Sequence, residues 1–569
     1  MTNAEIAQLF ADIADMLEIQ GEDRYRFLAY RRAADELGQY PGSVEALWQE
    51  GRLEEVPGVG KTLAAKIDEL LSTGTLKFYE RLRQEVPPTL IEVLRVPGVG
   101  PKRANLLWKT LGITDLATLE AAAKEGRLKG VKGLGAQTAQ NILKGIEALH
   151  SLGDRTLLGT ALPLAEMLLD ALRQGPGVVQ AEMGGSLRRR KETVGDIDLL
   201  CAAGDTAPVV QFFTELPQVR SVQSAGANKA TVILHRDLSV DLIVLPPASW
   251  GSLLQHFTGS QAHNVELRSA AVTQGLHVSE WGITRDGVLT PYADEAAHYR
   301  ALGLDWIPPE LREAEGELDA AREGRLPKLI EPGDVRGDLQ MHTTWSDGTR
   351  SVEEMARAAQ ALGYDWIAIT DHSKGLGVTQ GLDVERLAEQ RREIDAVNER
   401  LAPFRVLRSV ELEILADGTL DLPDETLAEL DVVVASVHTG QRADRAALMK
   451  RYLNAVHNPH VDIIAHPFGR LLNRRPPMDL DFEALVEACA ETGTALEING
   501  QADRMDLNGS QARYAMQRGV MISLASDAHH PDGLKVMSLA VSTARRAWLE
   551  PRHVLNAMRL DAFLAWLNR

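Results

Sequence analysis

The chain contains 569 residues, of which 44% are hydrophobic and 25% charged, a composition that excludes a wholly disordered or fibrous protein and predicts several globular domains. Two cysteines are present, Cys201 and Cys489, which excludes a disulfide framework and a cysteine zinc motif and favours a reducing cytoplasm. The 61 basic residues face 80 acidic ones, so the net charge of −19 excludes a uniformly basic nucleic-acid-binding surface.

The N-terminal region is closer to neutral than the rest. Residues 1–150 contain 19 Lys and Arg against 21 Asp and Glu, so a basic face is still available there for nucleic acid. No run approaches the roughly 18 apolar residues of a membrane span, and the N-terminus lacks the basic segment that opens a signal peptide. We therefore expect a cytoplasmic protein with no membrane partner.

A short glycine-containing phrase occurs three times in the first 150 residues, which are expected to be helical. It reads VPGVGKTLAAKI over 56–67, VPGVGPKRANLL over 96–107 and, more weakly, VKGLGAQTAQNI over 131–142. Each copy places a tight Gly-x-Gly turn before an amphipathic helix, whose free N-terminal amides can hold a phosphate oxygen. One copy is equally compatible with a glycine link in a helical bundle, but three copies favour DNA binding.

The repeated phrase resembles the helix-hairpin-helix motif, which binds the DNA backbone without reading its sequence. This resemblance implies DNA contacts at the glycines of the three turns. They are Gly58, Gly60, Gly98, Gly100, Gly133 and Gly135.

Carboxylates cluster in the middle of the chain, where helical spacing over 151–175 gives way to short β-rich runs. Asp196 and Asp198 are two residues apart in a strand-like run, so both point to one face, where like charges are unfavourable unless a cation bridges them. Asp241 lies in a second strand-like run, whereas Asp237 looks like a turn residue. Three carboxylates on adjacent strands can hold two divalent ions for phosphoryl transfer, although a lone Asp-x-Asp pair is commonly a solvated strand edge.

A turn suited to phosphate binding precedes these carboxylates. The amides of Gly184, Gly185 and Ser186 can hold phosphate oxygens, and three arginines follow at 188–190. The combination within 184–200 predicts a nucleoside triphosphate site beside the metal carboxylates.

The run GGSLRRRKETVGDIDLL (184–200) resembles the nucleotidyltransferase palm of family X DNA polymerases, the DNA polymerase beta family, and FTGSQAHNVELR (257–268) resembles its nucleotide-binding segment. The resemblance implies an α/β palm in which Asp196 and Asp198 hold Mg²⁺ or Mn²⁺ and Asp241 assists deprotonation of the primer 3′-hydroxyl. The residues that it assigns to the incoming nucleotide and the nascent base pair are Gly185, Ser186, Arg189, Gly195, Phe257, Gly259, Asn264 and Arg268.

Two positions depart from the family pattern. His256 stands where a Tyr is familiar, and His263 stands where a Phe is familiar. These departures concern sugar discrimination and base-pair geometry rather than the chemistry.

The first 80 residues resemble the small lyase domain of the same family. In the run VPGVGKTLAAKIDELLSTG, Lys66 occupies the position of the lysine that forms a Schiff base with deoxyribose phosphate, and Tyr30 matches a nearby supporting residue. A surface lysine on a helix is the alternative interpretation of Lys66.

Metal-ligand side chains follow successive strand-like runs from residue 337 onward. These runs alternate with helical stretches, as in a parallel barrel whose strand C-termini converge on one face. One histidine at a strand end is usually structural, but a set of such strand ends favours a metal centre. The candidate ligands are His342, Asp347, His372, Glu411, His438, His466, Asp527 and His529.

The same runs resemble the PHP phosphoesterase domain, a distorted (β/α)7 barrel that bacterial family X polymerases commonly carry at the C-terminus. The resemblance implies three divalent ions, Mn²⁺ or Zn²⁺. The implied ligand sets are His342, Glu411 and Asp527 for one ion, Glu411, His438 and His466 for a second, and Asp347, His372 and His529 for the third. Gln340 replaces the first histidine of the family's His-x-His motif, so we expect this ion to bind weakly and Mn²⁺ to be favoured.

The expected organisation is a lyase-like domain over 1–80, a helix-hairpin-helix subdomain over 81–150, a palm over 151–248, a nucleotide-selection subdomain over 249–315, a linker over 316–336 and a PHP domain over 337–569. We expect a monomeric, nucleoid-associated DNA polymerase that uses dNTPs to fill gaps during base excision or end joining, on gapped or primed DNA with or without a 5′-phosphate. For the PHP domain a 3′–5′ exonuclease is expected, with a phosphatase or a structural metal site as alternatives.

Overall fold

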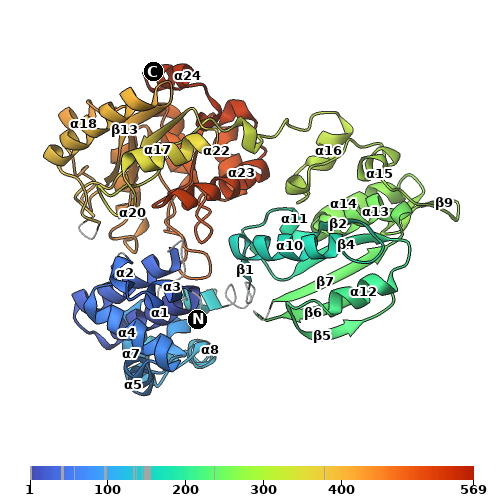
Figure 1. Cartoon of the computed structure of the whole chain (residues 1–569), viewed down its shortest axis with the longest axis horizontal. Coiled ribbons are helices and arrows are strands. Elements are labelled where there is room, and N and C mark those ends of the chain that lie inside the picture. Colours follow the sequence, from blue (N-terminus) through green and yellow to red (C-terminus); the bar gives the residue numbers. More distant parts are fainter. Residues whose placement is uncertain are drawn as a thin grey trace. The chain divides into compact units, whose positions relative to one another are not determined.

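The computed structural model describes residues 3–39, 44–56, 58–94, 96, 99–131, 135, 138–143, 145–146, 155–235, 238–376 and 379–568 (Figure 1). The chain forms two compact units. One comprises residues 1–153 with 473–476, and the other comprises residues 154–472 with 477–569. No helix in the described ranges is long and apolar enough to cross a membrane.

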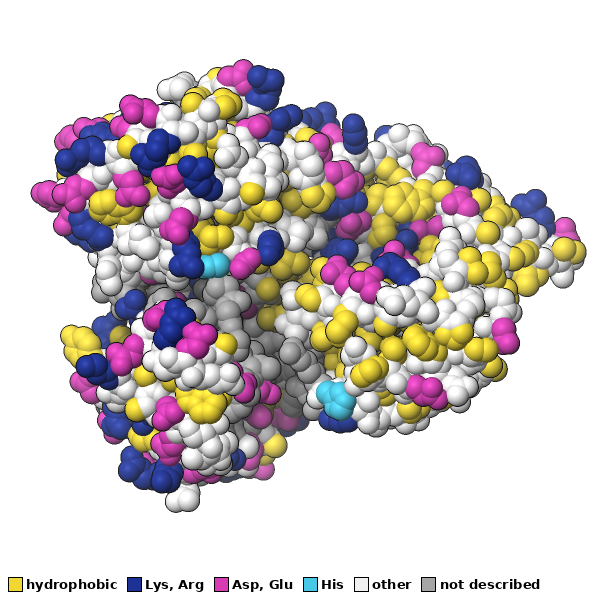
Figure 2. Space-filling view, in the orientation of Figure 1, with side chains coloured by type: hydrophobic (Ala, Val, Ile, Leu, Met, Phe, Trp, Pro, Cys, Tyr) yellow, Lys and Arg dark blue, Asp and Glu magenta, His cyan; other side chains and the backbone are white. Residues whose placement is uncertain are grey.

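The first unit is helical, as the sequence predicts. Its longer helices are α1 (Asn3–Gln20), α2 (Arg24–Gln39), α4 (Lys61–Thr73), α5 (Lys77–Glu85), α7 (Pro101–Leu111) and α8 (Leu116–Lys124), with the short α3 (Val44–Gln49) and α6 (Leu90–Val93) between them. Figure 2 shows acidic and basic side chains intermingled on its visible face, so the net charge of the chain does not make this face uniformly acidic.

The described residues of the first two glycine phrases lead into helices, as the sequence predicts. Gly60 and Gly100 are the N-cap residues of α4 and α7 and have extended backbones. The residue before each cap, Val59 or Val99, donates its amide to the carbonyl three residues earlier, at 3.0 and 2.9 Å. Gly58 has φ +74°, a backbone conformation that favours glycine. In the third phrase residues 138–142 are helical, as are residues 143, 145 and 146 after it, and Gly135 is described. Gly98 and Gly133 lie outside the described residues.

The second unit begins with a mixed sheet of order β2-β4-β7-β6-β5. Its strands are β2 (Val178–Met183), β4 (Ile197–Ala203), β5 (Val219–Ala225), β6 (Lys229–Leu234) and β7 (Ser239–Leu245). A two-stranded ribbon, β1 (Thr156–Leu157) with β3 (Thr193–Val194), lies beside it, and the helices are α10 (Leu158–Arg173), α11 (Gly185–Arg188) and α12 (Ala207–Thr214). Strands β4 and β7 are parallel neighbours, and their register pairs Asp198 with Asp241.

The segment after this sheet is a small domain of helices and a three-stranded sheet. It contains α13 (Trp250–Thr258), α14 (Gln261–Val272), β8 (Leu276–Ser279), β9 (Gly282–Arg285), β10 (Val288–Thr290) and α15 (Glu295–Ala301). Buried Leu267, Tyr299 and Ile307 form part of its core.

Residues 316–336, expected to be a linker, are packed in the structure. They contain α16 (Glu317–Arg322), whose Leu318 and Ala321 are buried in the core of the preceding small domain together with Leu329. The next residue, Ile330, belongs to the core of the barrel that follows. The segment therefore joins two hydrophobic cores, although its many charged residues predict an exposed connection.

The last part of the chain is a parallel sheet of seven strands in sequence order, from β11 (Gly337–Asp338) through β12 (Trp366–Ile369), β13 (Arg405–Glu413), β14 (Val432–Ser436), β15 (Ile463–Ile464) and β16 (Ala495–Asn499) to β17 (Ile522–Ala525). Its helices are α17 (Val352–Ala361), α18 (Val384–Leu401), α19 (Asp424–Leu427), α20 (Arg445–Val456), α21 (Phe482–Thr492), α22 (Gly509–Gln517), α23 (Met537–Arg546) and α24 (Leu560–Leu567).

Backbone contacts just beyond the first and last strands close this sheet toward a barrel. The amide of Asp527 donates to the Gln340 carbonyl at 3.0 Å, and the amide of His342 donates to the Ala528 carbonyl at 2.8 Å. A parallel bridge between Met341 and Ala528 joins the same two segments. The seven-stranded parallel barrel expected for the C-terminal domain is thereby confirmed, and its strand C-termini converge on one face.

Candidate active sites

A cluster of histidines and carboxylates occupies the C-terminal face of the barrel, and Glu411 on β13 is its centre. Its Oε1 lies 3.2 Å from His438 Nε2 and 3.0 Å from His466 Nε2. Its Oε2 lies 3.1 Å from His372 Nδ1 and 3.5 Å from His342 Nε2. Each histidine follows a different strand, so one carboxylate gathers side chains from four strand ends.

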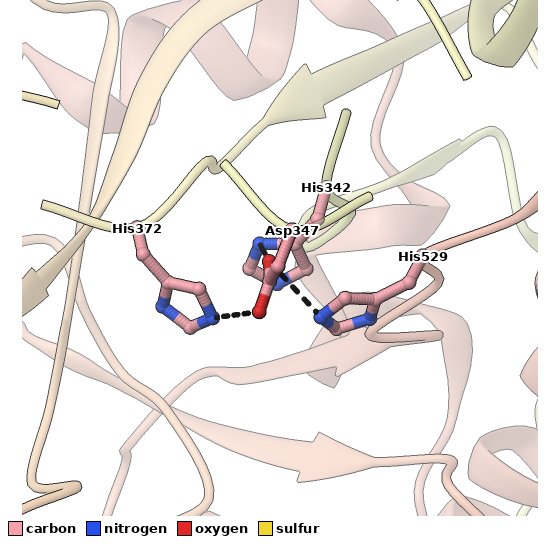
Figure 3. Close-up of side chains that lie close together, drawn as sticks. All are labelled: His342, Asp347, His372 and His529. Atoms are coloured by element: carbon pink, nitrogen blue, oxygen red, sulfur yellow. Dashed lines mark ion pairs between the residues drawn. The ribbon is translucent and has the colours of Figure 1, made fainter. Parts of the chain in front are cut away.

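Asp347 gathers the other side of the cluster (Figure 3). Its Oδ2 is 3.6 Å from His372 Nε2, and its Oδ1 is 3.4 Å from His529 Nε2 and 3.9 Å from His342 Nδ1. The ring of His342 stacks between those of His372 and His529, with centroids 4.5 and 4.2 Å away. Asp527 Oδ1 lies 3.2 Å from His342 Nε2. All eight residues that the sequence predicts as ligands are thus brought together.

The electrostatics of the cluster are those of close, buried opposite charges. Burial raises the pKa of Glu411, but His438 and His372 hold that pKa well below its usual range. Burial lowers the pKa of His438, yet Glu411 and Glu413 raise it to about 10. His529 behaves in the same way, because Asp347 and Asp527 raise its pKa to about 10 against burial. A metal ion that binds here would have to displace these protons.

A second layer of polar residues orients the ligands. Glu413 Oε2 accepts the backbone amide and Nδ1 of His438, each at 3.0 Å, which turns His438 Nε2 toward Glu411. Asn499 Nδ2 donates to Asp527 Oδ2 at 3.1 Å. Glu413 and Asn499 are not among the residues that the sequence predicts for this site. The signal for Glu413 was available, because it is two residues after Glu411 on one strand and shares its face.

Unpartnered buried atoms indicate that the cluster fits metal ions. Gln340 is fully buried, and neither its amide oxygen nor its amide nitrogen has a hydrogen-bond partner. His342 Nδ1 and His466 Nδ1 also lack hydrogen-bond partners. Buried polar atoms without partners are costly, and imidazole and carboxylate donors are ordinary ligands of divalent ions. Gln340 is therefore a buried amide without side-chain hydrogen bonds, at the position where the sequence predicts a weak ligand.

The three aspartates of the mixed sheet lie at its surface. Asp198 and Asp241 occupy paired positions on β4 and β7, and exposed Asp196 precedes β4. Burial raises the pKa of Asp198 to about 7, together with the negative charges of Asp196 and Asp241. Asp241 Oδ1 accepts a hydrogen bond from Thr231 Oγ1 at 2.7 Å, and its Oδ2 pairs with Lys229 Nζ at 2.9 Å. The raised pKa of Asp198 and the ion pair between Asp241 and Lys229 both indicate excess negative charge at this site. A cation would neutralise this charge.

The turn at 184–188 is built against Asp198. Gly185 has φ +54°, and a Cβ atom there would collide with Asp198 Oδ2, so only glycine fits. Ser186 lies in the short helix α11 that follows. The turn is anchored by Arg188, which donates to both carboxylate oxygens of Glu295 at 2.9 and 3.0 Å. Gly195 is exposed in the next loop.

Arg189, expected to bind triphosphate, has protein partners in this structure. Its Nε donates to Glu313 Oε1 at 2.9 Å and its Nη1 donates to the Thr258 carbonyl at 2.7 Å. Arg546 from α23 also donates to Glu313 Oε1, at 3.1 Å. A triphosphate contact by Arg189 would therefore replace or share the contact with Glu313.

The segment 257–268 places its residues along α13 and α14. The Asn264 amide nitrogen donates to the carbonyls of His256 at 3.0 Å and Gly259 at 3.3 Å, which fixes the connection between the two helices. Phe257 is partly buried beside His256, and Arg268 is exposed on α14. The nucleotide contacts expected for these residues remain predictions.

His263 is not available to a base pair. It is fully buried, and its Nδ1 lies 2.6 Å from Glu317 Oε1 while its Nε2 lies 3.3 Å from the Tyr299 hydroxyl. The departure at this position therefore serves the packing of α16 onto the small domain.

In the helical unit, Lys66 lies in a cationic, aromatic environment. Its Nζ is 4.1 Å from the centroid of the Phe78 ring, on which Tyr30 stacks at 5.8 Å. The guanidinium groups of Arg26 and Arg81 are each 5.4 Å from the same ring. Burial, together with Arg26 and Arg81, lowers the pKa of Lys66.

Comparisons with protein families match four segments of the chain. A helix-hairpin-helix domain matches residues 1–76, and a SAM-like helix-hairpin-helix tandem matches 90–148. The DNA polymerase beta thumb matches 253–313, and the PHP domain matches 338–501.

Comparisons with individual proteins find relatives that match all or part of the chain. The DNA polymerase/3'-5' exonuclease PolX of Bacillus subtilis (strain 168) is 37% identical over 573 residues, which cover 100% of both chains. DNA polymerase lambda of Rattus norvegicus is 25% identical over 55% of this chain and 56% of its own length. A probable phosphatase of Caldanaerobacter subterraneus is 32% identical over 34% of this chain and 75% of its own length. The chain belongs to the family X DNA polymerases that carry a C-terminal PHP domain.

Proposed function

We propose that this protein is a monomeric DNA polymerase of the cytoplasm that fills short gaps during DNA repair. The observation that carries the proposal is the pairing of Asp198 with Asp241 on β4 and β7 beside the Gly185 turn. The full-length similarity to a bacterial polymerase and the partial similarity to DNA polymerase lambda support the same activity. The substrates are primed or gapped DNA and dNTPs, and the helix-hairpin-helix turns of residues 1–150 bind the DNA backbone.

In this reaction the primer 3′-hydroxyl attacks the α-phosphate of a dNTP, and pyrophosphate leaves. Asp196, Asp198 and Asp241 would hold two Mg²⁺ or Mn²⁺ ions, which supply charge neutralisation along the line of attack. Asp241 assists loss of the proton from the primer hydroxyl. The glycine turn at 184–186 holds the triphosphate through its backbone amides, and Arg189 contributes a guanidinium.

We propose that the PHP domain is a metal-dependent 3′–5′ exonuclease. The main support for this proposal is that the eight predicted ligands lie close together around Glu411 and Asp347. The predicted ligand sets would hold up to three Mn²⁺ or Zn²⁺ ions, which lower the pKa of a bound water molecule and neutralise the phosphate. The name of the Bacillus subtilis relative includes this activity.

A phosphatase is the second candidate for the same centre, because 34% of this chain is 32% identical to a probable phosphatase. Incubation of the protein with Mn²⁺ and 3′-recessed DNA distinguishes the two. Shortening of the strand with release of dNMP supports the exonuclease, and it should disappear in His342→Ala. Release of inorganic phosphate without loss of nucleotides supports the phosphatase instead. Degradation that is unchanged in His342→Ala would make the centre structural.

We further propose that the helical unit cleaves 5′-deoxyribose phosphate through Lys66. An amine forms a Schiff base in its neutral form, and the surroundings of Lys66 lower its pKa while Arg26 and Arg81 supply positive charge for a phosphate. Borohydride reduction should trap the protein on a 5′-deoxyribose phosphate end. Trapping should be lost in Lys66→Ala and retained in Lys61→Ala, which removes a lysine from the start of the same helix. Equal trapping in the two variants would refute the assignment.

A further inference from the structure

Arg504 lies at the margin of the PHP centre and belongs to none of the predicted ligand sets. Its side chain is 22% exposed, comparable to that of His529, which is 26% exposed. By contrast, the side chains of His342 and Glu411 are 0% and 1% exposed. Arg504 is therefore about as exposed as His529 and more exposed than His342 and Glu411.

The turn that carries Arg504 is fixed at several points. Gln501 accepts the Arg504 amide at 2.9 Å and donates its own side-chain amide to the carbonyls of Ser526 at 2.8 Å and Asp527 at 2.9 Å. Arg470 Nε donates to the Arg504 carbonyl at 2.9 Å. Met505 is fully buried in the core of the polymerase palm. The guanidinium group thus extends from a backbone that is held before any ligand arrives.

The guanidinium group has no strong protein partner. Its Nε is 4.0 Å from Asp527 Oδ2, too far for a hydrogen bond, and that oxygen already accepts one from Asn499 at 3.1 Å. Its Nη1 is buried and has no hydrogen-bond partner. Within the described part of the chain, Arg504 is the one arginine or lysine that forms an ion pair with a predicted PHP ligand, because the other ion pairs of Asp347, Glu411 and Asp527 are to histidines.

We propose that Arg504 binds a phosphate group of the substrate in the PHP centre, a role that rests on the proposed exonuclease. A phosphodiester carries negative charge into a site lined by carboxylates, and guanidinium donors match two phosphate oxygens at once. Buried donors without partners are rare unless a ligand completes them. The unpartnered Nη1, the fixed turn and the partly exposed position beside Asp527 all fit this ligand.

The contact would act on the hydrolytic step. One water molecule is added across the scissile bond: its oxygen bonds to phosphorus, the bond from phosphorus to the 3′-oxygen breaks, and the released 3′-oxygen takes a proton. The products are a nucleoside 5′-monophosphate and a strand with a new 3′-hydroxyl. Negative charge on the phosphoryl oxygens increases in the transition state, so a guanidinium placed beside them lowers the barrier.

A purely structural role for Arg504 predicts something different. If Arg504 serves to position Asp527, its removal should weaken metal binding. If it binds phosphate, metal binding should persist while phosphate binding is lost. Calorimetry on the full-length protein can measure both without reference to activity, with Mn²⁺ alone and then with inorganic phosphate added to the Mn²⁺-loaded protein.

The experiment compares wild type with Arg504→Gln and Arg504→Lys. Arg408→Gln is the matched control, because Arg408 is 27% exposed on β13 and pairs with Asp395 rather than with the centre. We expect Arg504→Gln to weaken phosphate binding at least tenfold and to lower exonuclease kcat/KM by about a hundredfold, with Mn²⁺ affinity within twofold of wild type. Arg504→Lys should recover part of both losses, since an ammonium group keeps the charge but not the paired donors. Gap filling verifies that each variant is folded.

Unchanged phosphate affinity in Arg504→Gln, or a parallel loss of Mn²⁺ affinity, would overturn the proposal. A wild-type protein that binds phosphate through Arg504 yet never shortens DNA would overturn the exonuclease and leave the phosphate site standing. A wild-type protein that shortens DNA at the same rate as Arg504→Gln would overturn the phosphate site alone.

Discussion

The two proposed centres of the second unit are built in different ways. The palm site depends on one pair of strands, whose register brings Asp198 beside Asp241, and its third carboxylate, Asp196, is exposed. The PHP centre depends on strand ends around a nearly closed barrel, and Glu411 at its middle is 1% exposed. The palm site therefore needs the nucleotide and its ions for completion, whereas the PHP centre is enclosed by protein on most sides.

This difference predicts that the two activities can be removed separately. No predicted PHP ligand belongs to the palm sheet, and none of the three palm aspartates lies on the barrel. Substitutions that break one centre and leave the other intact test the comparison most strongly.

Asp198→Ala should have the largest effect. Because it removes a predicted ligand of both palm ions, nucleotide addition should fall by at least about a thousandfold, as expected for losing several kcal/mol of electrostatic stabilisation. Primer extension on gapped DNA measures it, and shortening of 3′-recessed DNA without dNTPs should continue at the wild-type rate. Undiminished extension would contradict the palm assignment.

Glu411→Gln should have the next largest effect. The substitution removes the negative charge of the carboxylate that contacts four histidines. Exonuclease activity should therefore fall by about two to three orders of magnitude. Elemental analysis should find less metal per chain, while gap filling stays within twofold of wild type. Full metal content in this variant would show that Glu411 is not a bridging ligand.

Glu413→Gln tests the second layer of the same centre. Glu413 accepts two hydrogen bonds from His438 and orients it, so its neutralisation should lower Mn²⁺ affinity by about 10- to 100-fold. Calorimetric Mn²⁺ titration of the full chain gives this value. Glu429→Gln, which changes an exposed glutamate paired with Arg391, is the control and should bind as wild type does.

Gln340→His should have the smallest effect and the opposite sign. An imidazole in place of the unpartnered amide supplies a better zinc ligand. The protein should therefore retain the ion assigned to His342, Glu411 and Asp527 about tenfold more tightly. The metal content after dialysis measures this gain. Three tightly held zinc ions in the wild-type protein would contradict the idea that Gln340 weakens the site.

Much of this arrangement can be predicted from the sequence, because ligands at the ends of apolar strands converge wherever parallel strands form a barrel. His342, Glu411 and Asp527 could be placed in one centre for that reason. Likewise, the two-residue spacing of Asp196 and Asp198 indicates a shared face.

Other features depend on contacts between distant segments. The pairing of Arg189 with Glu313 spans 124 residues, and no local pattern predicts it. The burial of Leu318 and Ala321 could not be predicted, because the charged residues around them in the sequence indicate an exposed segment. Arg504 belongs to no ligand motif, and its place beside Asp527 follows from the turn that Gln501 and Arg470 hold.

The central claim is that one chain contains two separate centres, one that adds nucleotides and one that removes them. The most direct test incubates wild type and Asp198→Ala with Mn²⁺ and one-nucleotide-gapped DNA, with and without dNTPs. We predict that wild type extends the primer with dNTPs and shortens it without them, and that Asp198→Ala only shortens it. Loss of both reactions in a folded Asp198→Ala protein would contradict the account, because a single centre would then perform both.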